Sequence, residues 1–382
     1  MRPATLLSWA LLAWSTWDPC DRAAAAPPDA VAAAIASRHV QEAAEPVSAR
    51  PGWAAPRTVL PLAFNDDGGW AAHRAAFAAA APGARIVAAA NMTQALAAAP
   101  DAQVVVGFNP GVCDARLIHR AQQLRWIESL AAGVDNCMAV PEIRARSLLL
   151  TNMRGVDAGV IAEHALALAL ALAHGLDTFA VDTEHGRFSA AHADDTPMQA
   201  LAGKTLLVVG LGGIGTQVAQ RAHGLGMTVT ATNAGTLTAP DFVSRVGPPE
   251  QLPALARQAD VIVSCVPLTP QTRGMYDAKF FALLKPTAFF INVARGGSVV
   301  TADLSAALGE HRLAGAGLDV VDPEPLPPDN PLWHAPHVII TPHVSSRSDL
   351  SGEERWILAA ENLRRYAAGA KMLSVVDLDK GY

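Results

Sequence analysis

The sequence predicts an α/β fold with two doubly wound parallel sheets. Short apolar runs of strand length alternate with helical segments, first over residues 57–152 and again over residues 204–343. Strands separated by helix-length segments form βαβ units, and such units build parallel sheets. The chain has 382 residues, 51% of them hydrophobic, which is enough for two or three domains with large cores.

The first alternation predicts the smaller sheet. Apolar runs without charges indicate strands, whereas apolar residues that recur on one helical face indicate helices. The strand-like runs are 58–64, 85–90, 103–108 and 147–152, and the helical patterns are 70–84 and 117–130.

The second alternation predicts a larger sheet. A long helical segment, residues 158–175, and a polar stretch, residues 182–197, come before it. The expected strands are 204–209, 227–233, 260–268, 287–297, 313–321 and 337–343. The chain ends with a helical pattern over residues 352–369, which needs a sheet to cover its apolar face.

Charge and hydropathy exclude some classes of partner. The net charge is −6 and no Lys/Arg cluster resembles a nucleic-acid footprint, so we expect no nucleic-acid partner. After residue 50 no uncharged apolar stretch approaches the roughly 20 residues of a membrane helix, so no membrane span is expected.

The amino end differs from the rest of the chain. Residues 1–26, with Arg2, an apolar segment and then small residues, resemble a secretory leader, although Asp18 and Asp21 weaken the match. Both an exported (periplasmic) and a cytoplasmic location stay open. Residues 27–56 are rich in Ala and Pro and indicate a linker, so we expect the folded part to begin near Arg57.

The cysteines and histidines give no metal site. Cys20, Cys113, Cys137 and Cys265 lack C-x-x-C spacing, and removal of a leader would leave an odd number, which argues against a disulfide framework. Cys265 lies in a buried-strand pattern and is expected to be an inert core thiol. No histidines have metal-ligand spacing. We therefore expect structural roles for His164, His334 and His337.

A glycine-rich turn at residues 208–215, "VVGLGGIG", has the flanks of a dinucleotide cradle. An apolar strand runs into Gly210, and a helical pattern leaves Gly215. In such a turn Gly210 permits the tight bend, Gly212 lets the backbone approach pyrophosphate, and Gly215 lets the helix pack on the strand. A tight βα turn without a ligand is the alternative on this motif alone.

Downstream motifs are more specific. The segments "INVARGG" (291–297), "GLDVVDPEPLPPDNPLW" (317–333) and "VIITPHVSS" (338–346) together resemble the D-isomer-specific 2-hydroxyacid dehydrogenase family, most closely its glyoxylate/hydroxypyruvate reductase branch. The segments 129–136, 162–168 and 267–275 are similar to family segments in the same order. The resemblance extends from about residue 57 to the carboxyl terminus.

The resemblance implies three catalytic residues. Arg295 would hold the substrate carboxylate and polarise the 2-oxo group, His343 would donate a proton, and Glu324 would be its partner. The chemistry agrees, because hydride transfer to a ketone puts negative charge on the oxygen, and imidazole exchanges protons near neutral pH. A guanidinium matches the two oxygens of a carboxylate. Taken singly, each residue has an ordinary structural explanation.

The resemblance also implies binding positions. Val106 and Gly107 match a loop whose backbone amides meet the substrate carboxylate, and Asp319 matches a residue that contacts the nicotinamide amide. The expected cofactor-binding residues are Gly210, Gly212, Gly213, Ile214, Gly215, Asn233, Pro267, Thr272, Val293 and Asp319.

Asn233 leaves the choice between NAD and NADP open. It stands where NAD-preferring members have an acid, eighteen positions after Gly215. A neutral amide does not repel a 2′-phosphate, but the following segment "AGTLT" offers no Arg or Lys to bind one.

These features predict a Rossmann-type cofactor domain, residues 152–342, inserted in a flavodoxin-like substrate domain formed by residues 57–151 and 343–382. The expected reaction is reduction of a small 2-oxo acid to the D-2-hydroxy acid with NADH or NADPH. The long apolar helix at 158–175 suggests a homodimer. The alternatives are a cofactor-sensing binding protein of the same fold and a phosphoglycerate-type dehydrogenase; no regulatory domain follows residue 382, which disfavours the latter.

Overall fold

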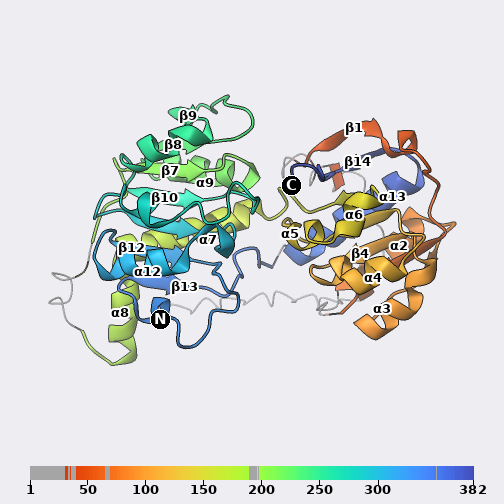
Figure 1. Ribbon diagram of the computed structural model, residues 1–382, viewed down its shortest axis with the longest axis horizontal. Coiled ribbons are helices and arrows are strands. Elements are labelled where there is room, and N and C mark those ends of the chain that lie inside the picture. Colours follow the sequence, from red (N-terminus) through yellow and green to blue (C-terminus); the bar gives the residue numbers. More distant parts are fainter. Residues whose placement is uncertain are drawn as a thin grey trace, which may run out of the picture.

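The computed structural model describes residues 31–32, 35, 40–64, 69–188, 196, 198–349 and 351–382. These residues form two lobes, each built on its own parallel sheet (Figure 1). The predicted leader, residues 1–26, lies outside the described residues.

The smaller lobe contains a five-stranded parallel sheet. Numbered within this sheet alone, its strands lie in the order 2-1-3-4-5, which is the flavodoxin-like order. The strands are β3 (Arg85–Ile86), β2 (Thr58–Pro61), β4 (Val104–Gly107), β5 (Trp126–Ser129) and β6 (Leu149–Thr151). All of the residues in β2, β4, β5 and β6 are buried, because helices cover both faces of the sheet.

Two apolar cores sandwich this sheet. One face is covered by α3 (Met92–Ala98), α4 (Ala115–Arg120), α5 (Asp135–Met138) and α6 (Pro141–Ala145). The other face is covered by α2 (Gly69–Ala80) and by the carboxyl-terminal helix α13 (Ser351–Ala367), which pack against each other. The ring of Trp356 from α13 lies 5.7 Å from that of Phe77 in α2. The terminal helix therefore covers the smaller sheet, although the larger lobe separates the two in sequence.

The folded part begins before Arg57, which corrects the expectation that residues 27–56 form a linker. Strand β1 (Glu42–Pro46) pairs antiparallel with β14 (Lys371–Leu373), and a side-chain ion pair joins Glu42 to Arg365. Strand β1 is mostly exposed, and its backbone, not an apolar face, makes the contact with β14. Its sequence "EAAEP" therefore lacks the period-two alternation that would have predicted a strand.

The larger lobe contains a seven-stranded parallel sheet. Numbered within this sheet, the order is 3-2-1-4-5-6 with a seventh strand at the far edge, which is the order of the Rossmann fold. The strands are β9 (Arg245–Gly247), β8 (Thr228–Thr232), β7 (Thr205–Val209), β10 (Val261–Ser264), β11 (Phe289–Asn292), β12 (Gly315–Leu318) and β13 (Val338–Ile340).

Helices cover both faces of this sheet too. α7 (Ala158–Ala173) and α9 (Gly213–Gly224) pack on one face, and α10 (Leu252–Ala256), α11 (Ala278–Phe281) and α12 (Thr301–Gly309) pack on the other. The remaining helical turns are short 3₁₀ segments, namely Val47–Ala49, Ala99–Asp101, Gly111–Cys113, Pro249–Gln251, Gly296–Ser298 and Pro331–His334.

The predicted interface helix is mostly an internal helix. Most α7 side chains are buried against α9, β11 and β12, so its apolar faces are used inside the lobe. The next helix, α8 (Leu176–Glu184), projects from the lobe (Figure 1). Among the described residues no single helix is long and apolar enough to cross a membrane; α7 and α8 pass that test only as a pair bent by 75°.

The chain passes between the lobes twice, after β6 and after β13. Both crossings contain a predicted domain boundary, at residues 151/152 and 342/343; these boundaries stay a prediction. Arg355 of α13 bonds to one residue of each crossing. Its guanidinium donates to the Asp157 carboxylate at 2.8 Å and to the Ser346 carbonyl at 3.2 Å.

Candidate active site

An imidazole–carboxylate pair lies beyond the carboxyl ends of β12 and β13. His343 Nδ1 lies 2.7 Å from Glu324 Oε1, and both side chains are about two-fifths exposed, at 41% and 43%. This contact fixes one ring nitrogen and leaves Nε2 as the atom that can exchange a proton with a ligand. The structure thus brings together the two side chains that the family resemblance paired.

The loop that carries His343 is held by Asp319 at the end of β12. The Asp319 carboxylate accepts hydrogen bonds from Thr341 Oγ1 at 2.7 Å, Val344 N at 2.9 Å and Ser345 N at 3.0 Å. Burial acts to raise the pKa of Asp319, but the hydrogen bonds from Ser345 and Thr341 outweigh it and hold the pKa below its usual value. The side chain is fully buried.

The Asp319 carboxylate also shapes the loop that carries His343, while its expected contact with the nicotinamide amide stays a prediction. Its oxygens accept hydrogen bonds from the loop at 341–345, because that loop folds back over the strand end. Here Asp319 is a positioning residue for His343. His164, which we expected to be structural, extends the network, since its Nε2 lies 2.9 Å from Thr341 Oγ1.

Arg295 follows β11 and reaches the other lobe. Its Nε donates to Asp135 Oδ1 of α5 at 2.9 Å, and its Nη1 donates to its neighbour's carbonyl, Ala294 O, at 2.8 Å. The side chain is 26% exposed. Arg295 and His343 each stand three residues past the ends of β11 and β13, which flank β12. Two strand spacings separate the ends of these two strands by about 10 Å at the same sheet edge.

Three residues beside Arg295 had no role in the sequence reasoning. Asp135 pairs with the guanidinium, and Gly133 lies so close that a Cβ there would meet Arg295 Nη2 at 1.3 Å. Asn109 Nδ2 donates to Gly133 O at 2.7 Å. The sequence "AAGVDN", in which small residues precede an acid, is consistent with a close approach by a cation. Only the folded chain shows that this cation is Arg295.

The predicted substrate-loop residues lie at the end of a strand. Val106 and Gly107 belong to the central strand β4, in register with Pro61 and Ser129, and their carbonyls accept from Leu62 N and Leu130 N. The expected contact of their amides with a substrate carboxylate stays a prediction. The loop after β4 starts at Phe108, and the next residue, Asn109, bonds to Gly133 beside Arg295.

The glycine turn has the shape of a dinucleotide cradle. Gly210 has a φ of +97°, and a Cβ there would lie 2.9 Å from Cys265 O. A Cβ on Gly215 would lie 2.1 Å from Gly210 O, whereas nothing lies within 4 Å of one on Gly212. Gly210 and Gly215 thus allow the close packing of strand and helix, and Gly212 faces open space.

Helix α9 starts at this open space. Gly212 is its N-cap, and the first helical hydrogen bond runs from Thr216 N to Gly212 O at 2.9 Å. The amides of Gly213, Ile214 and Gly215 therefore belong to the first turn, whose donors have no acceptor within a helix. Such donors and the helix dipole bind phosphate. The residues present thus fit the pyrophosphate of a dinucleotide.

The remaining predicted cofactor positions follow the carboxyl ends of β8, β10 and β11, and their side chains make different contacts. Asn233 directly follows β8, and its Nδ2 donates to Thr236 O at 2.8 Å. Thr272 closes the loop after β10 by donating to Pro267 O at 2.6 Å. Val293 is buried in the core beside α7, so only its backbone can reach a ligand.

The cysteines correct one prediction. Cys113 and Cys137 form a disulfide across 24 residues, although the odd count had argued against disulfides. Sequence spacing failed because the two residues meet only through the packing of η4 (Gly111–Cys113) on α5. Burial raises the pKa of Cys265 to about 12, so it is not a thiolate at neutral pH, as expected for an inert thiol.

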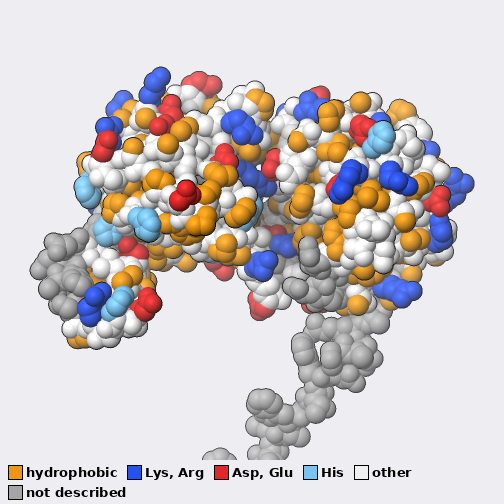
Figure 2. All heavy atoms as spheres, turned by 60° about the horizontal axis from the view of Figure 1, so that its bottom comes forward, with side chains coloured by type: hydrophobic (Ala, Val, Ile, Leu, Met, Phe, Trp, Pro, Cys, Tyr) orange, Lys and Arg blue, Asp and Glu red, His pale blue; other side chains and the backbone are white. Residues whose placement is uncertain are grey.

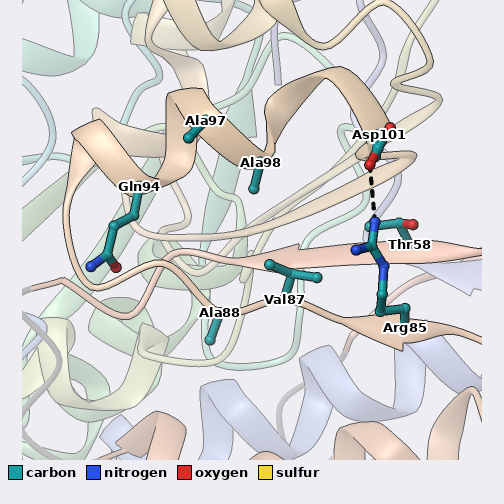
Figure 3. Close-up of a pocket in the computed structure, with 8 residues that line it drawn as sticks. All are labelled: Thr58, Arg85, Val87, Ala88, Gln94, Ala97, Ala98 and Asp101. Atoms are coloured by element: carbon teal, nitrogen blue, oxygen red, sulfur yellow. Dashed lines mark hydrogen bonds and ion pairs between the residues drawn. The ribbon is translucent and has the colours of Figure 1, made fainter.

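One pocket lies away from these residues. It has a volume of about 410 Å³ and lies between β3 and α3 in the smaller lobe, with the Arg85–Asp101 ion pair at 3.0 Å and several alanines in its wall (Figure 3). It contains no acid–base pair. The candidate residues instead lie where the two lobes meet, a region that Figure 2 shows as a waist in the molecular surface. Among the described residues no cluster of His, Cys, Asp or Glu could hold a metal.

A Rossmann-type sheet with a phosphate cradle beside an Arg and a His–Glu pair defines an NAD(P)-dependent oxidoreductase. Comparison with known proteins agrees. The family model for the NAD binding domain of D-isomer specific 2-hydroxyacid dehydrogenases matches residues 166–345. The mouse protein "Glyoxylate reductase/hydroxypyruvate reductase" is 34% identical over 286 residues, 72% of this chain and 86% of that protein. The chain belongs to the D-isomer-specific 2-hydroxyacid dehydrogenase family.

Solved structures show the same likeness. A D-isomer specific 2-hydroxyacid dehydrogenase family protein from Aeromonas salmonicida has 30% identity and a TM-score of 0.73, over 85% of this chain and 100% of that one. An NADPH-dependent glyoxylate/hydroxypyruvate reductase from Sinorhizobium meliloti, solved with NADP and sulfate, has 26% identity and a TM-score of 0.72, over 86% of this chain and 100% of that one.

Proposed function

We propose that this protein reduces a small 2-oxo acid of the glyoxylate or hydroxypyruvate type to the D-2-hydroxy acid, with Arg295, His343 and Glu324 as its catalytic residues. The observation that carries the proposal is the 2.7 Å pair of His343 and Glu324, which follow β13 and β12, at the same edge of the sheet as Arg295, which follows the neighbouring strand β11. Two observations support it: relatives are named as glyoxylate/hydroxypyruvate reductases, and these side chains have the chemistry that the reaction needs.

Each side chain has a distinct task. The bound reduced nicotinamide supplies a hydride to the 2-oxo carbon. Arg295 binds the substrate carboxylate and draws electron density toward the 2-oxo oxygen, because a guanidinium is a permanent cation with a planar set of donors. His343 gives its Nε2 proton to that oxygen as negative charge develops on it. Glu324 accepts from Nδ1, fixes the ring orientation and stabilises the protonated ring.

The cradle at Gly210, Gly212 and Gly215 would hold the pyrophosphate, and Asn233 would lie beside the adenosine ribose. Because Arg295 in one lobe bonds Asp135 in the other, the substrate site needs both lobes, and closing them excludes water from the reacting atoms. A binding protein without activity would not need the His343–Glu324 pair. We therefore favour the enzyme over the cofactor-sensing alternative.

The phosphoglycerate alternative has less support. The "D-3-phosphoglycerate dehydrogenase" of Mycobacterium bovis is 31% identical over 75% of this chain, but the match spans only 53% of that protein. The reductases named above are matched over most of their length.

We further propose a homodimer that forms through α8. This helix exposes Leu176 and Val181, which a monomer would leave in water, and Phe188 and Met198, which follow the helix in the chain, are exposed too. Replacing Leu176 and Val181 by Asp should convert a dimer into a monomer in sedimentation-velocity experiments. A wild-type protein that sediments as a monomer would refute this interface.

A substrate panel tests the proposed function. Glyoxylate, hydroxypyruvate, phenylpyruvate and 2-oxoglutarate are each assayed with NADH and with NADPH, and the two small acids should have the highest kcat/KM. Arg295→Lys retains the charge but loses the planar set of donors, so KM for the acid should rise and kcat should fall. A panel in which no 2-oxo acid is reduced, or an Arg295→Lys enzyme with unchanged KM, would remove this proposal.

A further inference from the structure

A disulfide borders the substrate side of the proposed site. Cys113 ends the loop that follows β4, and Cys137 lies in α5, the short helix after β5. Their Cα atoms are 4.8 Å apart, and the two residues are 5% and 0% exposed. The bond therefore joins the loop at 108–113 to the segment at 133–138, and the second of these segments contacts Arg295 through Gly133 and Asp135.

From this bond a short series of contacts leads to Arg295. Asp135, two residues before Cys137, accepts from Arg295 Nε at 2.9 Å. On the other side of the disulfide, Asn109 places Oδ1 3.3 Å from Cys113 Sγ and donates from Nδ2 to Gly133 O at 2.7 Å. Gly133 lies directly against the guanidinium. Asp135 thus contacts Arg295 directly, and the loop acts on Arg295 through Gly133.

Helix α5 depends on such external contacts for its position. It has four residues, Asp135–Met138, and its N-cap, Val134, offers no side-chain hydrogen bond. A single helical turn is not stable alone in water, so packing and cross-links decide where it lies. The disulfide supplies a covalent link within two residues of the carboxylate that orients Arg295.

We propose that the Cys113–Cys137 disulfide is a positioning element for substrate binding: it holds Asp135, and through Asp135 Arg295, in the orientation that receives a 2-oxo acid carboxylate. This rests on the proposed function of Arg295. Reduction by a dithiol transfers two electrons and two protons, gives two cysteine thiols and converts the dithiol to its own disulfide. Oxidised glutathione then takes two electrons and two protons from the two thiols, which restores the disulfide and gives two molecules of reduced glutathione. Binding of the acid thus depends on the redox state of this pair.

The test compares the oxidised full-length enzyme with the double variant Cys113→Ala/Cys137→Ala. Peptide mapping by mass spectrometry first establishes the cross-link in the oxidised protein. KM for glyoxylate at saturating NADPH should rise at least about fivefold in the double variant, whereas KM for NADPH should change by less than about twofold. The matched control is Val140→Ala, which removes apolar atoms from the same core without touching the cross-link and should leave both values unchanged.

The redox state gives an independent readout. Wild-type enzyme treated with dithiothreitol, and shown by alkylation to be reduced at both cysteines, should have the raised glyoxylate KM, and oxidised glutathione should reverse it. A purely structural bond would lower Tm in the double variant without this split between substrate and cofactor. An unchanged glyoxylate KM, or no cross-linked peptide, would overturn the proposal. Oxidised enzyme that fails to reduce glyoxylate at all would instead refute the proposed function.

Discussion

His343 has a φ of +53°, in the left-handed region of backbone conformation. For a residue other than glycine this costs about 1 to 3 kcal/mol and persists only where surrounding contacts enforce it. Asp319 supplies those contacts through Thr341, Val344 and Ser345. A family motif predicted that His343 and Asp319 matter, but it could not show that one acts by holding the loop of the other.

Replacing His343 by Ala tests the proton donor. Loss of a positioned general acid should reduce kcat on the order of 100-fold, and the Kd for NADPH should change little. Glu324→Gln, which retains a hydrogen-bonding group at Nδ1 but loses the charge, should have a smaller effect. Steady-state kinetics and a fluorescence titration with NADPH measure both. Turnover close to wild type in His343→Ala would exclude His343 from the mechanism.

Asn233 tests the choice of cofactor. A carboxylate in Asn233→Asp would accept from the ribose hydroxyls of NADH and repel the 2′-phosphate of NADPH. The ratio of kcat/KM for NADH over NADPH should rise about tenfold, because one close like-charge contact costs about 1 kcal/mol or more. Ala234→Arg should move the ratio the other way by offering the phosphate a cation. If neither variant changes the ratio, Asn233 does not lie beside the ribose.

At the scale of elements, the strand–turn–helix formed by β7 and α9 was predictable because its sequence is locally consistent. A continuous apolar strand, three glycines and a helical pattern all indicate the same turn, and in the structure Gly210 and Gly215 each have a separate steric reason. Strand β1 was not predictable, because its pairing with β14 depends on backbone groups more than 300 residues away.

Gly212→Ala separates cofactor binding from folding. Nothing lies within 4 Å of a Cβ at Gly212, so Tm should not fall, but the added methyl would occupy the space that pyrophosphate needs. The Kd for NADPH should rise at least about tenfold. Gly224→Ala, at the other end of α9 and equally open, is the control and should leave Kd unchanged. Normal NADPH binding by Gly212→Ala would mean that this turn is not the cradle.

Strand β5 carries a buried carboxyl group whose ionisation should affect stability. Glu128 is fully buried, and its Oε2 accepts from Thr151 and Asn362, each at 2.8 Å. Burial raises its pKa to about 8 from 4.5. Since the folded state binds the proton more tightly than the unfolded state, this stabilisation is complete below about pH 4.5 and is lost as the pH rises through about 8.

The prediction from Glu128 concerns the pH dependence of unfolding. Between pH 6 and pH 9 the wild-type free energy of unfolding should fall by roughly 2 kcal/mol more than that of Glu128→Gln, which has the same shape and no titration. Urea unfolding at each pH measures the difference between the two proteins, so other titrating groups cancel. Parallel curves for the two proteins would show that Glu128 does not ionise in this range.

At the scale of the whole molecule, the sequence predicted the two parallel sheets, because periodicity and βαβ alternation are local signals. It also predicted His343, Glu324 and Arg295, because their motifs follow strand ends where ligands bind. It missed Asp135, Asn109 and the Cys113–Cys137 bond. These act across the two lobes or between distant loops, and no spacing along the chain encodes such contacts.

The central claim is that the site reduces 2-oxo acids on one defined face. Hydroxypyruvate tests it directly, since its reduction creates a new stereocentre whereas that of glyoxylate does not. Purified enzyme, hydroxypyruvate and NADPH or NADH are incubated, and the glycerate formed is resolved by chiral chromatography. D-glycerate alone should form, in equal amount to the cofactor oxidised, and His343→Ala should form roughly a hundredth as much over the same time. Formation of L-glycerate, or no oxidation of either cofactor, would contradict it.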